Sequence, residues 1–290
     1  MWWIMGRDLF VTDQGRGPCV LAVHGQPGLA SDWDSVLSRL ADDHRVLAVD
    51  RPGYGRTGGD AVGMAANAEM LADMLVDRGA APVTVVGHSY GGGIAILLAA
   101  LRPEVVSGLV LVGSVGRTDS LNLVDRVLAL PWAGEALTAA GLLTLGRVLS
   151  PLRGLAGHVP GRRLAWLEAS LPDRRFVEAA SGFERQIWRS FVFEQRALVR
   201  EIGDVEAALS RVRVPTVVIS GTWDLVVPAS VAASLAAAVP GAQLVIVART
   251  GHFVPRDAPG VVARAVRTVE AGSLAVDELD PDVGGRADEA

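Results

Sequence analysis

The sequence of 290 residues predicts an α/β protein: a mostly parallel central sheet with helices on both faces, interrupted by an all-helical insertion. The first observation is that short runs, apolar throughout, alternate with stretches of helical periodicity, as in parallel sheets covered on both sides. The second is that this alternation stops between about residues 117 and 211, where only helical periodicity is found. The third is that it resumes until about residue 270.

Before the insertion, the apolar runs predict strands at residues 19–23, 46–49, 83–86 and 109–112. Helical spacing between these runs predicts helices at about residues 33–40, 64–75 and 94–101. Residues 2–12 are expected to form a hairpin or a strand pair. Parallel strands of this kind connect through right-handed crossovers, so the helices should cover both faces of the sheet.

Within the insertion, short helical segments are separated by prolines: Pro131, Pro151, Pro160 and Pro172. After it, we expect strands at residues 216–220 and 244–247 and helices at residues 231–239 and 261–269. The predicted organisation is therefore an α/β core made of residues 1–116 and 212–270, with residues 117–211 inserted into it. Residues 271–290 are acidic and lack periodicity, which predicts a disordered tail.

Composition narrows the classes of partner. The formal net charge is −5, and much of it comes from the acidic tail. No basic stripe or polybasic run is present, so we expect neither a nucleic-acid nor a membrane-surface partner. The single cysteine, Cys19, cannot form an internal disulfide. Without a signal-peptide pattern or an apolar run of membrane-spanning length, a cytoplasmic location is expected. Homo-oligomerisation is left open.

A candidate nucleophile stands in the segment Gly87-His88-Ser89-Tyr90-Gly91, which matches Gly-x-Ser-x-Gly. The motif is weak alone, but a predicted strand ends directly before it and a predicted helix starts directly after it. This is the strand–turn–helix setting that presents a serine on a strained turn at the carboxyl edge of a sheet. The alternative is a glycine-rich turn in which the serine only caps the helix.

The sequence resembles the α/β-hydrolase superfamily, in the branch that contains cofactor-free haloperoxidases, small-molecule esterases and meta-cleavage C–C hydrolases. The resemblance covers nearly all of residues 10–270 except the insertion, which is similar to the variable cap of that family. It rests on the Ser89 turn and on four further landmarks: His24-Gly25-Gln26-Pro27-Gly28, Asp50-Arg51-Pro52-Gly53-Tyr54-Gly55-Arg56-Thr57, Gly221-Thr222-Trp223-Asp224 and Gly251-His252-Phe253. The resemblance implies the α/β-hydrolase fold, with structural roles for His24 and Asp50.

A serine hydroxyl needs a base to take its proton, and the imidazole of that base needs an orienting partner. Of the five histidines, His252 lies in a loop between the predicted strand at residues 244–247 and the last helix. The superfamily carries its base at this edge, so we expect His252 to be the base rather than a merely hydrogen-bonded loop histidine. The other four are expected elsewhere: His24 in a structural loop, His44 on the surface, His88 within the turn and His158 in the insertion.

The candidate acid is Asp224, which follows the predicted strand at residues 216–220. The order Ser89, Asp224, His252 is the order serine, acid, histidine of this fold. Two alternatives are a purely helix-capping role for Asp224 and the use of Asp119 as the acid, since some family members carry it at that point. Asp257 is expected to cap the last helix.

A tetrahedral intermediate needs two preorganised hydrogen-bond donors. By position, these are the backbone N–H groups of Gln26 and Tyr90, although the Gln26 side chain could donate to substrate instead. A serine nucleophile makes epoxide hydrolase and haloalkane dehalogenase activity improbable, because those relatives attack with aspartate. The segment Gly53–Gly58 matches the dinucleotide-binding pattern Gly-x-Gly-x-x-Gly, but no helix opens within it and no acid ends a following strand.

The expected activity is hydrolysis of a carboxylic ester, lactone or thioester of a small, largely apolar substrate through an acyl-enzyme on Ser89, with no metal or organic cofactor. C–C bond hydrolysis, perhydrolysis and non-hydrolytic acyl transfer or cyclisation remain alternatives, as does a binding protein that has lost catalysis. Some apolar side chains of the insertion should line the pocket and the others should form the core of the cap: Leu121, Leu123, Leu128, Trp132, Leu137, Leu142, Leu145, Leu149, Trp166, Phe183, Trp188, Phe191 and Phe193.

Overall fold

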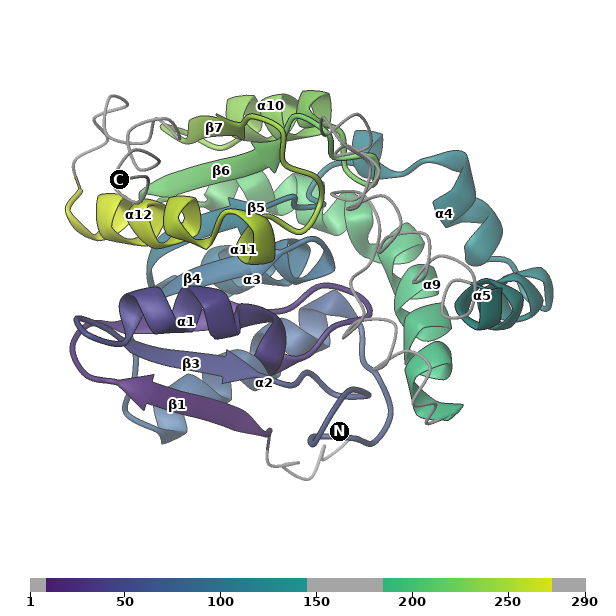
Figure 1. Ribbon diagram of the computed structural model, residues 1–290, viewed down its shortest axis with the longest axis horizontal. Helices are drawn as coiled ribbons and strands as arrows, with labels where there is room; N and C mark the ends of the chain where they lie inside the picture. Colours follow the sequence, from purple (N-terminus) through teal and green to yellow (C-terminus); the bar gives the residue numbers. More distant parts are fainter. Residues whose placement is uncertain (1–8, 145–184, 273–290) are drawn as a thin grey trace, which may run out of the picture.

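The computed structural model describes residues 9–144 and 185–272. Its centre is a seven-stranded sheet with the order β1-β3-β2-β4-β5-β6-β7 (Figure 1). The strands are β1 (Val11–Gly15), β2 (Cys19–Val23), β3 (Arg45–Val49), β4 (Val83–His88), β5 (Val106–Val112), β6 (Thr216–Gly221) and β7 (Gln243–Val247). All neighbouring strands run parallel except β1, which pairs antiparallel with β3. The predicted mostly parallel sheet is therefore confirmed.

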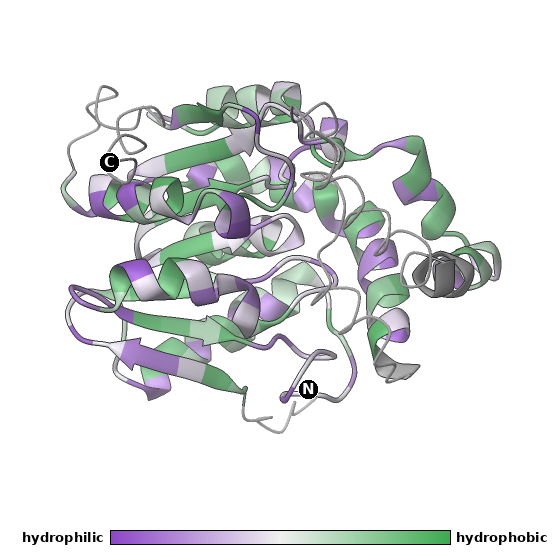
Figure 2. Ribbon diagram, in the orientation of Figure 1, coloured by the Kyte–Doolittle hydropathy of each residue, from purple (hydrophilic) through white to green (hydrophobic). Residues whose placement is uncertain are grey.

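The first strand differs from the prediction. Residues 1–8 lie outside the described residues, and β1 begins at Val11, where the expected hairpin or strand pair was about to end. β1 is an edge strand whose last three residues are exposed, so it carries no apolar run to mark it. Figure 2 shows the same contrast, with β1 mostly hydrophilic and the central strands mostly hydrophobic.

Side chains of successive strand residues enter two separate cores, one on each face of the sheet. In β2, Leu21 and Val23 join one core, while Val20 and Ala22 join the other. The first core is covered by α2 (Met64–Asp77), α3 (Tyr90–Leu101) and α10 (Ala229–Ala238). The second core is covered by α1 (Asp34–Leu40), α11 (Val254–Asp257) and α12 (Pro259–Glu270).

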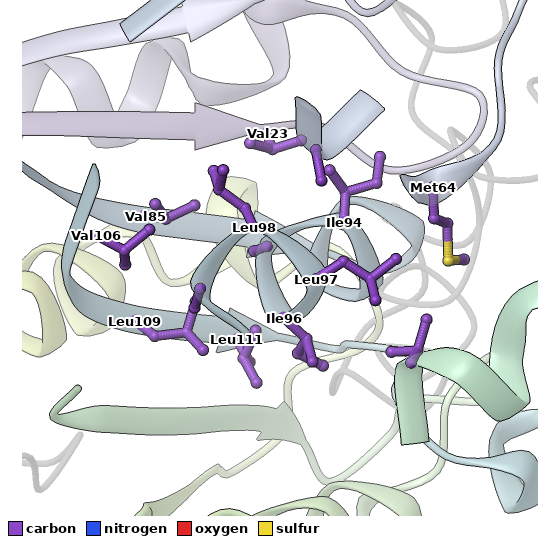
Figure 3. Packing of buried hydrophobic residues seen from close by; sticks show 14 of the residues in the cluster. Val23, Met64, Val85, Ile94, Ile96, Leu97, Leu98, Val106, Leu109 and Leu111 are labelled. Atoms are coloured by element: carbon purple, nitrogen blue, oxygen red, sulfur yellow. The ribbon is translucent and has the colours of Figure 1, made fainter. Parts of the chain in front are cut away.

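Helix α3 is the central element of the first core. It is buried along almost its whole length, from Tyr90 to Ala99. In Figure 3, Ile94 and Leu98 of this helix lie beside Val23 and Val85 of the sheet. Burial of such a side chain is worth roughly 2 kcal/mol. The packing holds the first residues of α3 firmly against the carboxyl ends of β2 and β4.

Between β5 and β6 every described regular element is a helix: η3 (Thr118–Ser120), α4 (Leu123–Leu128), α5 (Ala133–Thr144), α9 (Arg185–Ala208) and η5 (Leu209–Arg211). In Figure 1 α4, α5 and α9 lie beyond the carboxyl ends of the parallel strands. Leu198, Ile202 and Val205 attach α9 to the first core. Four of the expected pocket or cap residues, Leu145, Leu149, Trp166 and Phe183, lie outside the described residues. The same holds for His158, Pro151, Pro160, Pro172 and the tail from residue 273.

The remaining short helices are η1 (Ala30–Trp33) and η2 (Pro103–Val105). Among helices within residues 9–144 and 185–272, none has both the length and the apolar character needed to cross a membrane.

Candidate active site

Ser89 lies in a strained turn between β4 and α3. Its φ and ψ are 54° and −120°, a region that residues other than glycine rarely adopt and that costs roughly 1–3 kcal/mol. Backbone hydrogen bonds hold it there: Ser89 N donates to Val112 O over 3.0 Å, and Ser89 O accepts from Gly92 N over 3.0 Å. The turn ends β4 and places the serine at the carboxyl edge of the sheet, as the sequence predicted for a nucleophile elbow.

Asp224 and His252 form a buried pair. Nδ1 of His252 lies 2.9 Å from Oδ2 of Asp224, and the two residues are only 6% and 5% exposed. Oδ1 of Asp224 accepts hydrogen bonds from the backbone N–H groups of Val226, at 2.9 Å, and Val227, at 2.8 Å. Since a carboxylate oxygen accepts, Nδ1 carries the proton and the lone pair of His252 is on Nε2. This is the tautomer that a base needs.

The end of β5 contacts both the serine and this pair. Val112 is the residue whose carbonyl accepts from Ser89 N, and Gly113 follows it. A methyl group on Gly113 would lie 3.2 Å from both Asp224 Oδ2 and His252 Nδ1. Ser89 and the acid–base pair are thus gathered at the adjoining ends of β4, β5 and β6.

His88 connects the serine turn to the candidate base. Its Nε2 lies 3.0 Å from the carbonyl oxygen of His252, and the two imidazole rings are 4.7 Å apart. Burial, reinforced by the neighbouring His252, lowers the pKa of His88 to about 3. His88 is therefore neutral at ordinary pH, and because a carbonyl can only accept, its Nε2–H is the donor. The loop that carries His252 is fixed to the residue before Ser89.

The other histidines that the structure describes have structural partners. Nε2 of His24 accepts from the backbone N–H of Arg51 over 3.0 Å, in agreement with its expected structural role. The prediction that His44 lies on the surface is wrong, because His44 is 4% exposed. Its ring lies 2.7 Å from Asp43 Oδ1 and 2.7 Å from Glu270 Oε2, so hydrogen bonds on both sides compensate its burial.

The alternative acid does not reach the candidate base in this structure. Asp119 is in η3, where its carboxylate accepts from Ser234 Oγ over 2.7 Å and lies 3.5 Å from Arg117 Nε. Asp257 pairs with the neighbouring Arg256 instead of bonding to the site. Asp224 is thus the one of these three acids that bonds to His252.

The loop that carries Gln26 lies against the serine turn. A methyl group on Gly25 would lie only 3.0 Å from Ser89 Cβ, so the loop passes very close to the candidate nucleophile. Within the described parts of the chain, no hydrogen bond is found for the backbone N–H of Gln26 or Tyr90. Both are therefore suitable as donors to an oxyanion. The side-chain amide of Gln26 donates to Gln195 Oε1 over 2.6 Å.

Comparison with known proteins identifies the family. Residues 20–265 match the family model described as "Alpha/beta hydrolase family". The chain belongs to the alpha/beta hydrolase family. The predicted fold and the family resemblance are both confirmed.

Relatives of this alpha/beta hydrolase include an uncharacterized protein of Mycobacterium tuberculosis, which is 32% identical over 275 residues. The match covers 88% of this chain and 77% of the relative. A pimeloyl-[acyl-carrier protein] methyl ester esterase of Nitrosomonas europaea is 29% identical over 250 residues, with 84% of this chain and 92% of the relative covered. Among solved structures, a thermophilic esterase from Thermogutta terrifontis has a TM-score of 0.70 at 22% identity, with 91% and 93% coverage. This last likeness concerns the fold.

The glycine-rich segment of this alpha/beta hydrolase is a loop, as its context indicated. Gly53 N donates to Gly58 O over 2.8 Å, and α2 does not begin until Met64. Gly53 O accepts from Ser190 Oγ of α9 over 2.8 Å. Asp50 at the start of the loop accepts backbone hydrogen bonds from Ala30 and Arg56, so it is structural, as expected. The arrangement does not fit a dinucleotide site, in which the third glycine packs a helix against the strand.

Sequence reasoning missed a buried charge pair beside the site. Arg51, just after β3, and Glu194, on α9, are both completely buried and hydrogen-bonded to each other. The hydroxyl of Tyr54 donates to Glu194 Oε2 over 2.7 Å. The landmark Asp50–Thr57 pointed to the arginine, but Glu194 lies 143 residues further along the chain. Only the fold reveals this partner.

Proposed function

We propose that this alpha/beta hydrolase is a serine hydrolase that cleaves a carboxylic ester, lactone or thioester of a small, largely apolar substrate. The observation that carries the proposal is the 2.9 Å hydrogen bond between Asp224 and His252 at the strand ends where the strained Ser89 turn lies. This combination supplies an orienting acid and a base with a free Nε2. Together with the Ser89 hydroxyl, these are the side chains that acyl transfer by a serine hydrolase requires.

In the proposed reaction, Ser89 Oγ attacks the carbonyl carbon while His252 Nε2 takes its proton. Asp224 keeps the imidazole oriented and stabilises its positive charge. The negative oxygen of the tetrahedral intermediate accepts hydrogen bonds from the N–H groups of Gln26 and Tyr90. When the intermediate collapses, His252 gives the proton to the departing alcohol or thiol, and Ser89 is left acylated.

Water completes the cycle. His252 takes a proton from the water molecule as it attacks the acyl carbon, and a second tetrahedral intermediate forms at the same oxyanion donors. Its collapse returns the proton to Ser89 Oγ and releases the carboxylic acid. The same base, acid and oxyanion donors therefore act in both the acylation and the deacylation step.

The preference for an apolar substrate is supported by side chains next to the acid. Leu225 and Val226 directly follow Asp224 and are 68% and 50% exposed. Exposed apolar side chains thus lie directly beside the candidate acid, an arrangement typical of surfaces that bind apolar ligands.

Two experiments test the proposal. A fluorophosphonate should label the wild-type protein covalently and leave Ser89→Ala unlabelled, whereas equal labelling of the two would remove Ser89 from its assigned role. Short acyl esters should be hydrolysed faster than glycosyl or phosphoryl esters, and the opposite ranking would contradict the assigned substrate class. Labelling at Ser89 without ester turnover would instead favour C–C hydrolysis or acyl transfer.

A further inference from the structure

Helix α9 contacts the loop at residues 24–26 through two consecutive residues, Glu194 and Gln195. Glu194 Oε2 lies 3.1 Å from Arg51 Nη2, and Arg51 Nη1 also bonds to Glu194. Gln195 Oε1 accepts a hydrogen bond from the side-chain amide of Gln26, and Gln195 Nε2 donates one to Asp125 Oδ1 over 2.9 Å. The inserted helices are thereby connected to the loop that carries one of the proposed oxyanion donors.

Arg51 transmits this contact to the backbone of the loop. Its Nη2 donates to the carbonyl oxygen of Gly25 over 2.8 Å, and its Nε donates to that of His24 over 3.1 Å. Its own backbone N–H bonds to His24 Nε2. The guanidinium group is fully buried, and the rings of Tyr54 and Tyr90 lie 5.0 and 5.1 Å from its central carbon. Because Glu194 also bonds to both Nη atoms, the guanidinium group is held in one orientation.

The carbonyl of Gly25 and the N–H of Gln26 belong to the same peptide group. Because a peptide group is planar, fixing the direction of the carbonyl also fixes the direction of the N–H. A cationic donor on the carbonyl oxygen polarises the whole peptide group, which makes its N–H a stronger donor. Arg51 therefore acts on one end of the peptide whose other end is proposed to meet the oxyanion.

We propose that Arg51 and Glu194 are positioning residues that aim and polarise the Gln26 N–H toward the oxyanion. The inference rests on the proposed function, in which that N–H is an oxyanion donor. Glu194 keeps the buried guanidinium paired, since an unpaired buried charge is strongly unfavourable. In this way an element of the insertion contributes to transition-state stabilisation without touching the substrate.

The test replaces the pair by apolar residues, Arg51→Met with Glu194→Leu, since exchanging a buried ion pair for apolar side chains often preserves stability. A second variant, Glu194→Asp, keeps the charge paired but withdraws the carboxylate by one methylene. The matched control is Glu201→Gln. Glu201 lies two turns further along α9, and its carboxylate accepts from the backbone N–H groups of Met64, over 2.7 Å, and Ala65.

Three quantities separate positioning from a structural role: kcat and KM for a short acyl ester, and the affinity for a trifluoromethyl ketone that adds to Ser89 as a tetrahedral mimic. In the double variant we expect kcat and the affinity for the mimic to fall together by about 10- to 100-fold, and KM to stay within about threefold of the wild-type value. The loss should be smaller than the factor of about 10²–10³ in kcat that removal of a whole oxyanion donor costs. Glu194→Asp should show a smaller loss in the same direction, and Glu201→Gln should match wild type.

Two results would overturn the inference, and they differ from each other. If wild type hydrolyses the ester through Ser89 but Glu194→Asp and the double variant match Glu201→Gln in both kcat and affinity for the mimic, the positioning role is wrong and the proposed function stands. If Ser89→Ala retains the full ester turnover of wild type, the proposed function fails and the inference fails with it.

Discussion

Replacing Gly113 by alanine should damage the acid–base pair directly. Gly113 directly follows β5 and has a φ of 49°, and a methyl group there would lie 3.2 Å from Asp224 Oδ2, 3.2 Å from His252 Nδ1 and 3.3 Å from His252 Cε1. Contacts of this length are tighter than about nine in ten Cβ contacts, so the two side chains must move away from the strand end by a few tenths of an ångström. The bond between them is 2.9 Å long.

The size of the effect follows from that bond. A hydrogen bond to a charged group contributes roughly 1.5–3 kcal/mol, and about 1.4 kcal/mol corresponds to a tenfold change in rate. If the displaced pair loses most of this energy in the transition state, kcat should fall by about 10- to 100-fold. The positive φ adds a stability cost of roughly 1–2 kcal/mol for alanine, which is independent of the site.

A second glycine separates these two effects. Gly79, after α2, has a φ of 59°, and a methyl group there has no neighbour within 4 Å in the described structure. Gly79→Ala should therefore lower the free energy of unfolding by a similar backbone amount without changing kcat. Urea denaturation and turnover of a short acyl ester measure the two quantities. A Gly113→Ala enzyme whose kcat stays within threefold of wild type would refute the reasoning.

Two further predictions concern other parts of the site. Asp224→Ala should lower kcat by about 10³- to 10⁴-fold and Asp119→Ala by less than about threefold in an ester assay; the opposite ranking would reassign the acid. The pKa of His88 is lowered to about 3 in the folded state, whereas an unfolded histidine has a pKa of about 6.5. As the pH falls, the unfolded state therefore binds a proton before the folded state does, and stability decreases below about pH 6.5. Between pH 7 and pH 5, wild type should therefore lose about 2 kcal/mol more unfolding free energy than His88→Gln in urea titrations, and equal losses would contradict the buried neutral imidazole.

The central strands were predictable because parallel strands buried on both faces leave an unmistakable apolar run. The run predicted at residues 83–86 became β4, and that at residues 19–23 became β2 with unchanged limits. The turn at Ser89 was predictable for a related reason, since its motif stands where such a run meets a helix. Local sequence is informative wherever burial on both faces dictates composition.

Partners that come from distant segments were not predictable in this way. His44 stands in a polar stretch and looks like a surface residue, but Glu270 at the end of α12 covers it. Glu194 has the sequence context of an ordinary helix residue, yet it is completely buried because Arg51 lies opposite it. Polar composition alone does not show whether the solvent or a charged partner satisfies a side chain.

The strand order explains why the candidate site needs a glycine that no motif marks. Ser89 follows β4 and Asp224 follows β6, while β5 lies between these strands. For His252 to serve Ser89, the bonded Asp224–His252 pair has to extend across the end of β5, where a Cβ on Gly113 would lie 3.2 Å from both side chains. An acid after β5 itself would avoid the crossing, but Asp119 is drawn away by Ser234 and Arg117. With the acid after β6, the residue directly after β5 has to lack a side chain, and Gly113 meets that requirement.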